Sequence, residues 1–278
     1  MAGLARAAPD SVCELTGEAL AQSQEVQVRE VFDGDTVQLA DGRKVRLIGI
    51  NTPELARDER PEEPLAREAR VALAVWQGKT LRLLTGEERK DRYGRTLGHL
   101  FAPDGSNITA ALLAEGLGFP VVIPPNVAFS DCYRQRAHAA GSRGVGVWHH
   151  GYHRLRAPSV AEDLQGGFGR YRGKIERVYI TDKIIWIDFI GDLSVRVAKK
   201  DLPYLQGEVL DDLLKAVDQE RVQQMPQLTV SGWVMDRTRW GARMARLVAS
   251  GKRNRWQVNV RHRHHWQWSV PGSDKPVP

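Results

Sequence analysis

The sequence has no long apolar run, few cysteines and one long segment without acidic residues. Each of these shortages excludes or disfavours a class of protein or site. No apolar run approaches the roughly 20 residues that a membrane-spanning helix needs, so we expect no membrane partner. Cysteine occurs only at Cys13 and Cys132, and the histidines have no cysteine at the spacing of a structural zinc site. Acidic residues are missing from Arg237 to Gly272, where nine basic residues occur.

The chain is long enough for two domains, and its charge is divided unevenly between its halves. It has 278 residues, of which 42% are hydrophobic, so it can bury a core. It carries 40 Lys and Arg against 34 Asp and Glu, a net charge of +6. Residues 1–150 contribute −2 and residues 151–278 contribute +8. The excess favours a polyanionic partner, and its partition predicts two domains with different tasks.

The two cysteines and the N-terminal residues give information on the cellular location of the protein. Cys13 and Cys132 are either two unrelated buried thiols, as expected in the cytosol, or a disulfide candidate that joins the N-terminal arm to a later helix. The first residues lack the apolar segment of a complete signal peptide, whereas Ala5-Arg6-Ala7 has the small-x-small form of a cleavage site. We expect a periplasmic or secreted protein on this pattern.

The residue pattern of the first half predicts the short strands of a small β-barrel. Apolar and polar residues alternate over three stretches between residues 25 and 50, with the hairpin signal Asp41-Gly42 between the last two. Helical spacing over 65–76 precedes two more strands, at 79–84 and 95–101, and two helices, at 108–115 and 128–140. Five short strands with an intervening helix predict an α+β domain, an OB-fold Greek-key barrel with three helices.

The second half repeats this plan weakly. Three strands are expected at 171–180, 183–190 and 193–198, then a helix over 211–219 and strands at 227–234, 242–248 and 256–260. Val45-Arg46-Leu47 closes the first trio of strands and Val195-Arg196-Val197 closes the second. We expect a second OB-like β domain, with a plain β-sandwich as the alternative. The predicted organisation is an N-terminal arm (1–25), a barrel domain (26–148), a linker (149–169), a basic accessory domain (170–268) and a tail (269–278).

Three stretches of the first half bring together residues suited to phosphate chemistry. They are Asp33-Gly34-Asp35-Thr36, Arg46 through Glu54, and Asp91-Arg92-Tyr93-Gly94-Arg95. A hairpin can place the loop before one strand beside the loop after its partner, so oxygen ligands would converge as a hard divalent cation requires. Two arginines facing the same pocket would offer forked donors to a phosphate. Each stretch alone is usually a turn or a loop, and only their order and spacing together are specific.

These motifs resemble the staphylococcal (micrococcal) nuclease, or thermonuclease, family. The family pattern of Asp-Gly-Asp-Thr, then Arg-Leu and Asp-Thr-Pro-Glu, then Tyr-Gly-Arg is matched from about Val26 to Trp148. The resemblance implies an OB-fold endonuclease that hydrolyses phosphodiester bonds of DNA and RNA with Ca²⁺.

The resemblance also assigns roles to single residues. Asp35 matches a calcium ligand, and Thr52 matches the residue whose backbone carbonyl binds calcium. Arg46 and Arg95 match the two arginines on the scissile phosphate. Glu54 matches the carboxylate that orients or deprotonates the attacking water. Asn51 stands where well-known members have an aspartate, so weaker Ca²⁺ binding, or another divalent cation, is expected.

The second half lacks this chemistry and has a basic, aromatic segment instead. Basic side chains contact phosphates and aromatic rings stack on bases, as in OB grooves that bind single strands. A solvated basic face over core tryptophans is the alternative. The predicted nucleic-acid-binding residues are Arg237, Arg239, Trp240, Arg243, Arg253, Arg255 and Trp256.

Three functions are consistent with the sequence. The first is a metal-dependent endonuclease with a basic accessory domain, acting on DNA, RNA or both. The second is a weakly active or inactive nuclease scaffold that binds nucleic acid, which Asn51 favours and the retained Arg46, Glu54 and Arg95 disfavour. The third is a protein-interaction module, although no protein partner is indicated.

Overall fold

The computed structural model describes residues 13–15, 17–57 and 60–269. The chain divides into two compact units, with the boundary between Tyr152 and His153. Most of the predicted arm, with its Ala5-Arg6-Ala7 motif, and the predicted tail after Ser269 lie outside the described residues. No helix within the described ranges is long and apolar enough to cross a membrane.

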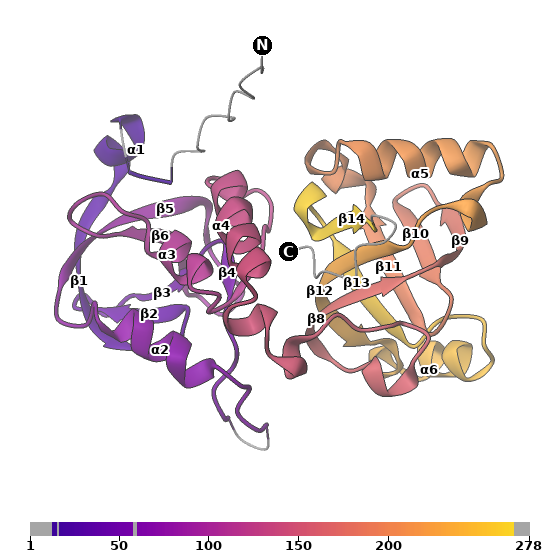
Figure 1. The fold of residues 1–278 in the computed structure, drawn as a ribbon, viewed down its shortest axis with the longest axis horizontal. Coiled ribbons are helices and arrows are strands. Elements are labelled where there is room, and N and C mark those ends of the chain that lie inside the picture. Colours follow the sequence, from indigo (N-terminus) through magenta and orange to yellow (C-terminus); the bar gives the residue numbers. More distant parts are fainter. Residues whose placement is uncertain (1–12, 16, 58–59, 270–278) are drawn as a thin grey trace, which may run out of the picture. The chain divides into compact units, whose positions relative to one another are not determined.

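The first unit is a closed five-stranded barrel (Figure 1), which confirms the predicted OB-type fold. Its strands follow the order β1-β2-β3-β6-β5, with β3 and β6 parallel and the other pairs described antiparallel. A short pair, β4 with β7, lies outside the barrel. The strands are β1 (Gln24–Val31), β2 (Thr36–Leu39), β3 (Lys44–Leu47), β4 (Ile50–Asn51), β5 (Thr80–Lys90), β6 (Thr96–Phe101) and β7 (Phe119–Pro120).

Alternation of buried and exposed side chains explains these strands. In β1, Val26, Val28 and Val31 face the core while their neighbours are exposed. A β-bulge between Val28 and Glu30 shifts the register, so the third valine also points inward. Gly42 adopts the positive φ that the tight turn between β2 and β3 needs. The hairpin that carries two of the predicted site motifs therefore forms where the sequence predicts it.

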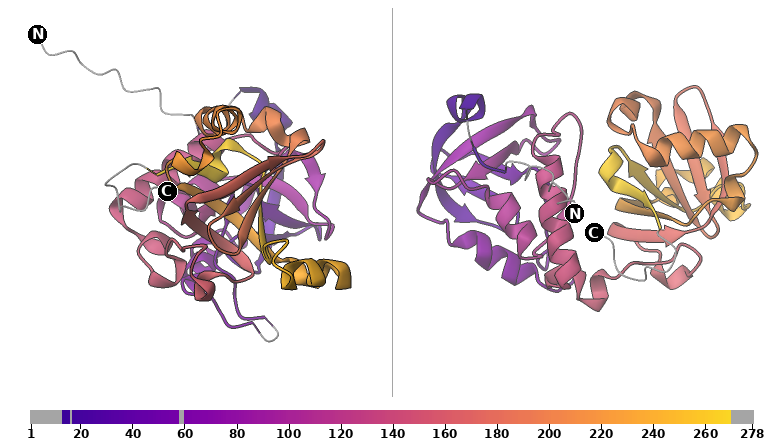
Figure 2. Two further views of the ribbon diagram at one scale, coloured as in Figure 1. Left: turned by 90° about the vertical axis from the view of Figure 1, so that its right-hand side faces the viewer. Right: turned by 45° about the horizontal axis from the view of Figure 1, so that its top comes forward.

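Helices of the first unit pack beside the barrel, and Figure 2 shows α3 next to α4. Asn107 caps α3, because its Oδ1 accepts a hydrogen bond from the Ala110 amide (3.0 Å). Gly144, with a positive φ, ends α4. The helices are α1 (Gly17–Gln22), α2 (Ala66–Ala74), α3 (Ile108–Ala114) and α4 (Ser130–Arg143), followed by the short 3-10 helices η1 (Gly146–Trp148) and η2 (Gly151–His153).

A buried polar cluster fixes α4 against the barrel. The Tyr133 hydroxyl lies 2.7 Å from Nδ1 of His99 in β6 and 3.0 Å from Nδ2 of Asn107. Gly49 lies directly on the Tyr133 ring, where an added Cβ would meet a ring carbon at 2.2 Å. Because Gly49 also has a positive φ, only glycine fits the turn that leads from β3 into β4. The packing of Tyr133, in α4, on Gly49 thus fixes the path of the chain into β4, which contains Asn51.

The described part of the N-terminal arm is held to this unit. Cys13 and Cys132 form a disulfide with a Cα–Cα distance of 5.6 Å. Leu15 is buried, and its amide donates to the Gly105 carbonyl (3.0 Å).

The second unit has the strand connectivity of the first. The strand order is β9-β10-β11-β13-β12-β8, with β11 and β13 parallel and the other neighbouring pairs antiparallel. Only Lys174 separates β8, which pairs with β12, from β9, which pairs with β10, so these two strands connect both edges of the sheet in a barrel-like arrangement. The strands are β8 (Gly167–Gly173), β9 (Ile175–Ile180), β10 (Ile184–Phe189), β11 (Leu193–Ala198), β12 (Leu228–Asp236), β13 (Trp256–Val260) and β14 (Trp266–Trp268).

One predicted strand of this unit is wrong. Residues 242–248 were expected to be extended, but they form α6 because their alanine, arginine, methionine and leucine side chains favour helix. Helices α5 and α6 lie at opposite ends of this barrel (Figure 1). The helical segments are η3 (Ala161–Asp163), η4 (Lys199–Tyr204), α5 (Glu208–Asp218), η5 (Val222–Gln224), η6 (Arg237–Trp240), α6 (Ala242–Ala249) and η7 (Arg263–His265).

The segment interpreted as a linker is largely folded onto the second unit. Asp163 is buried, pairs with Arg154 and accepts a hydrogen bond from the Ala157 amide (2.8 Å). Leu164 belongs to the core of that unit. Its Gly and Pro residues therefore shape turns on the barrel surface instead of a free tether.

The disulfide yields a stability prediction. It closes a loop between residues 119 positions apart, so Cys13→Ser should lower the free energy of unfolding by roughly 2–4 kcal/mol. Urea unfolding of the variant and the wild type measures this loss. Thiol titration of the unreduced, denatured wild type should detect no free thiol, and the same titration after reduction is the control. Two free thiols before reduction would contradict the disulfide.

His99 predicts an acid dependence of stability. Burial lowers the pKa of His99 from 6.5 to about 3. In the unfolded chain, His99 takes up a proton as the pH falls below 6.5, whereas in the folded protein it stays neutral down to about pH 3. The free energy of unfolding therefore decreases as the pH falls through this range. The cost is up to about 1.4 kcal/mol per pH unit.

We expect His99→Gln to flatten the fall in unfolding free energy between about pH 7 and about pH 4, measured by urea denaturation. The exposed His138→Gln is the matched control and should behave as wild type. An unchanged slope in the His99 variant would rule out this histidine as the cause.

Candidate active site

The candidate site is built around the Asp35 carboxylate, at the start of β2. Thr36 pairs with Arg46 across the β2–β3 hairpin, and the Leu47 amide donates to the Asp35 carbonyl (2.8 Å). Asp35 is only 5% exposed. Its Oδ2 accepts hydrogen bonds from both the amide and the hydroxyl of Thr52 (3.1 Å each). The hairpin and the turn after β4 therefore meet at one carboxylate, as the sequence predicts.

Arg46 completes this junction. Its Nη2 forms an ion pair with Asp35 Oδ2 at 2.9 Å, and the arginine side chain is 14% exposed. Nη1 donates to the carbonyl oxygens of Leu47 and Ile50 (2.6 and 2.9 Å). Three of the five guanidinium donors are thus used, and two remain for an anion.

Gly34 allows the close approach of these segments. A Cβ at this position would lie 2.6 Å from the Ala69 Cβ of α2 and 2.8 Å from the Thr52 side chain. The glycine between Asp33 and Asp35 is therefore required for packing against α2. It brings the acidic turn within reach of Thr52.

Asn51 and Glu54 follow on from this turn. Asn51 is buried and pairs with Phe119 between β4 and β7. The Glu54 amide donates to Glu63 Oε2 (3.1 Å), and the Glu63 amide donates to the Glu54 carbonyl (2.9 Å). This pair of bonds holds the base of the loop that begins at Glu54.

Arg95 is positioned by Asp91 at the turn before β6. Asp91 Oδ2 accepts from Arg95 Nε (2.7 Å), while Oδ1 accepts from the amides of Tyr93 and Arg95 (2.9 Å each). Gly94 supplies the positive φ of the turn. Because Nε is the bonded nitrogen, the two terminal nitrogens of Arg95 stay available for a phosphate.

The charges of these residues act on one another. Partial burial and the negative charge of Asp35 raise the pKa of Glu54, while Arg46 and Arg95 act to lower it. Burial and the same Asp35 charge raise the pKa of Asp33 to about 6. The structure thus brings Asp35, Arg46, Glu54 and Arg95 into one electrostatic environment, with Thr52 in contact.

The donor set fits a hard cation. No cluster of three or more His, Cys, Asp or Glu side chains suited to a metal occurs in the described part of the chain. Oxygen donors are nevertheless present in the Asp35 carboxylate and in Asn51, the residue before Thr52, and Ca²⁺ accepts carboxylate, amide and carbonyl oxygens. Burial first, and then the neighbouring Asp35 charge, raise the pKa of Asp33, so a bound cation would offset the second of these effects.

Two positioning residues were not assigned from the sequence. Asp91 was recognised only as part of a motif, although an aspartate four residues before an arginine in a Gly turn is a signal for such a contact. Glu63 left no signal, because it follows a loop whose fold the sequence does not define.

The predicted nucleic-acid-binding residues all lie in or beside the β12–β13 connection of the second unit, but they divide into groups. Arg237 and Arg253 contact the rings of Trp186 and Tyr179. Arg255 is paired with Asp236 (2.7 Å), so its charge is compensated. Trp256 is partly buried against the core of that unit. Arg239, Trp240 and Arg243 are exposed, as are Arg253 and Arg255.

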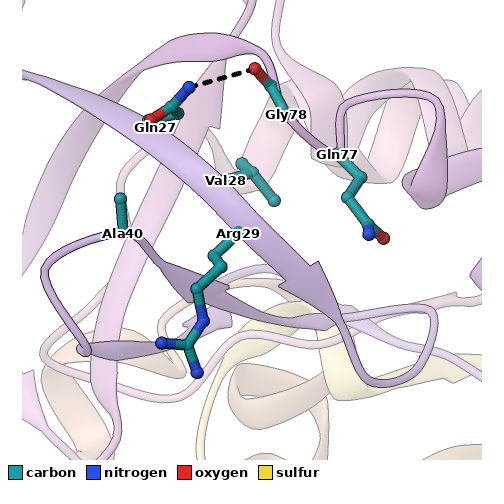
Figure 3. Close-up of a pocket in the computed structure, with 6 residues that line it drawn as sticks. All are labelled: Gln27, Val28, Arg29, Ala40, Gln77 and Gly78. Atoms are coloured by element: carbon teal, nitrogen blue, oxygen red, sulfur yellow. Dashed lines mark hydrogen bonds between the residues drawn. The ribbon is translucent and has the colours of Figure 1, made fainter.

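A separate pocket of the first unit, of about 420 Å³, carries no comparable chemistry (Figure 3). Its lining includes one charged side chain, Arg29, which donates to Gln38 (2.7 Å). Gln27 donates to the Gly78 carbonyl across its rim (3.3 Å). None of its lining residues belongs to the candidate site.

Comparison with known proteins shows the family to which the first unit is similar. Residues 44–150 match the family described as Staphylococcal nuclease homologue, an interval that holds Arg46, Glu54 and Arg95 but begins after Asp35. The thermonuclease of Staphylococcus intermedius is 32% identical over 125 residues, 44% of this chain and 74% of the relative. The thermonuclease of Staphylococcus hyicus is 31% identical over 137 residues, 48% and 80% of the two chains. An endonuclease of Bacillus subtilis is 30% identical over 129 residues, 44% and 61%. The chain therefore belongs to the staphylococcal nuclease family.

Proposed function

We propose that the first unit is an endonuclease that hydrolyses phosphodiester bonds of DNA, RNA or both, with Ca²⁺ as its cation. One observation carries the proposal: Asp35 holds Arg46 and Thr52 directly, and the charges of Asp35, Arg46 and Arg95 all act on the Glu54 carboxyl. Neither a binding scaffold nor an interaction module requires this combination of a carboxylate base and two guanidinium groups.

Each side chain has a chemical task. Glu54 accepts a proton from the attacking water or orients it, and its raised pKa brings it closer to that of a useful base. Arg46 and Arg95 donate to the phosphate oxygens on which negative charge accumulates. Asp91 keeps the Arg95 fork directed, so it is a positioning residue.

Asp35, the Asn51 amide and the Thr52 backbone carbonyl would hold the cation. When bound, Ca²⁺ supplies positive charge that stabilises the developing anion. With an amide at position 51 the ligand set has one negative charge fewer than an aspartate would provide. The proposed site therefore favours weaker Ca²⁺ binding, or another divalent cation.

We also propose that the protein works in the periplasm or outside the cell. The disulfide between Cys13 and Cys132 supports this location, because disulfides persist in oxidising compartments.

A second candidate function is nucleic-acid binding on a weakly active or inactive nuclease scaffold. Asn51 favours it, because a site that holds its cation poorly would bind the substrate without cutting it. The retained Glu54, with its raised pKa, favours the enzyme.

Removal of the proposed base or of one arginine should abolish most of the cleavage. We expect Glu54→Gln and Arg95→Ala each to reduce kcat by about 10²–10³-fold, because each removes transition-state stabilisation. Initial rates of cleavage of a labelled oligonucleotide in Ca²⁺ measure this. The exposed Glu87→Gln and Arg134→Ala are matched controls in the same unit and should retain activity. Near-wild-type rates in both site variants, with the fold intact by circular dichroism, would refute the assignment.

Restoring the missing ligand charge should tighten cation binding. We expect Asn51→Asp to lower the Ca²⁺ concentration for half-maximal cleavage by about tenfold, since ligand charge count tunes Ca²⁺ affinity. Calcium titrations of cleavage rate and of calorimetric heat measure the change. Gln77→Glu, exposed in the same unit, adds the same charge elsewhere and should leave the titration unchanged. An equal shift in both variants would mean that Asn51 is not a ligand.

A further inference from the structure

The outer surface of the second barrel carries a pair of neighbouring aromatic side chains, Tyr179 and Trp186. Their place in the sheet follows from the pairing of the strands. Trp186 of β10 lies opposite Tyr179 of β9, and opposite Arg196 of β11. Trp186 alternates with Ile185 and Ile187, which belong to the core, so its side chain is on the outer face. The rings of Tyr179 and Trp186 are nearly parallel, with an interplanar angle of 15° and centroids 6.1 Å apart.

The corresponding position of the first barrel belongs to the candidate active site. There Thr36 pairs with Arg46, and β3 runs parallel to β6 as β11 runs parallel to β13. If Arg46 and Arg196 are superimposed by this register, Trp186 takes the place of Thr36 and Ile185 the place of Asp35. The second barrel therefore has a core isoleucine where the first has a carboxylate, and a tryptophan where the first has a threonine. By this register the second barrel has no counterpart of the Asp35 carboxylate.

Arginines from the β12–β13 connection converge on the ring pair. The Arg253 guanidinium lies 5.6 Å from the Tyr179 ring centroid, and Arg237 lies 5.2 Å from that of Trp186 and 5.9 Å from that of Trp240. Arg253 is exposed, and 49% of Trp240 is exposed. Cations close to exposed rings are the combination that holds both the phosphates and the bases of a single strand.

Arg237 is the least ordinary member of this group. It is 2% exposed, and its Nη1 donates to the Asn254 carbonyl (3.2 Å), while its Nε has no hydrogen-bond partner among the described residues. No carboxylate within the described ranges forms an ion pair with it. A buried guanidinium without a directly paired carboxylate is costly even though the charges of Asp188 and Asp192 act on it, and a bound phosphate chain would supply further negative charge.

Two acidic groups on this side of the barrel, Asp188 and Asp236, are paired with arginines, and a third, Asp192, accepts a backbone amide. Asp188 is buried, pairs with Arg177 at 2.7 Å and accepts from the Ser194 hydroxyl at 2.6 Å. Asp236 pairs with Arg255, and Asp192 accepts from the Arg255 amide (2.6 Å). Arg196, Arg237 and Arg253 form no ion pair within the described structure, and Asp188 and Asp192 act on Arg237 only through their charges, so the surface favours a polyanion.

We propose that this surface, formed by Tyr179, Trp186, Arg196, Arg237, Trp240 and Arg253, binds single-stranded nucleic acid, with unpaired bases stacked on Tyr179 and Trp186. A single strand fits better than a duplex, because aromatic stacking requires bases that are not already stacked and paired. The site is separate from the proposed catalytic site and does not depend on hydrolysis.

The test is binding of a fluorescein-labelled oligodeoxythymidylate to the full chain, measured by fluorescence anisotropy in excess chelator so that cation-dependent cleavage is suppressed. We expect Trp186→Leu to raise Kd by roughly five- to one-hundredfold, the loss of about one stacked base. Arg253→Ala should reduce the slope of log affinity against log salt concentration by about 0.7, the value for one phosphate contact on a single strand. A labelled duplex of the same length should bind more weakly to the wild type.

Two matched controls lie on the same unit. Trp233→Ala removes an exposed tryptophan of β12 whose ring packs on Phe168 instead of on the Tyr179–Trp186 pair. Arg221→Ala removes an exposed arginine whose side chain contacts Gln219. Both should bind as wild type.

The proposal is overturned if Trp186→Leu and Arg253→Ala, folded by circular dichroism, bind the single strand as the wild type does. Equal affinity of the wild type for duplex and single strand would also overturn it. Since Arg253 is exposed, its variant decides the matter even if the tryptophan variant does not fold. Cleavage by the first unit is assayed separately, so failure of this site and failure of the proposed endonuclease are distinguishable.

Discussion

The ion pair between Asp35 and Arg46 is the contact on which the candidate site depends. Its 2.9 Å bond joins the start of β2 to β3, and the same carboxylate oxygen receives both donors of Thr52. Breaking it would leave a buried charge without its partner, which is far more costly than losing an exposed pair. Gly34 and Gly49 permit the close approaches that make it possible, since larger side chains would collide with α2 and Tyr133.

Much of this could be predicted from the sequence, and the exceptions have physical reasons. The alternating valines and the Asp41-Gly42 turn define the first hairpin, and its length brings Asp35 beside Thr52. Contacts made by loops could not be predicted, because a loop has no residue periodicity that defines its path. The hydrogen bond from the Glu54 amide to Glu63 is such a contact. Residues 242–248 were misassigned because a short apolar and basic stretch reads as strand or helix equally well, and here helix propensity prevailed.

The two barrels show how one topology supports different chemistry. In the first barrel β3 runs parallel to β6, and in the second β11 runs parallel to β13. A helix, α2 or α5, precedes the strand that follows in each barrel, β5 or β12. In the first, the second strand begins with a buried aspartate that gathers an arginine and a threonine. In the second, the corresponding strand presents Trp186, and the connection after β12 supplies arginines instead of carboxylates. The net charge of −2 in the first half and +8 in the second follows from this division.

The central claim is that the residues gathered around Asp35 form a working, cation-dependent hydrolytic site despite Asn51. It is tested most directly by the initial rate at which the purified full chain cleaves a labelled oligonucleotide, in Ca²⁺, in chelator and after Ca²⁺ is restored. The account predicts cleavage in Ca²⁺, loss of cleavage in chelator and recovery on adding the cation back. Binding of the oligonucleotide without cleavage in Ca²⁺, Mg²⁺ or Mn²⁺ would contradict it.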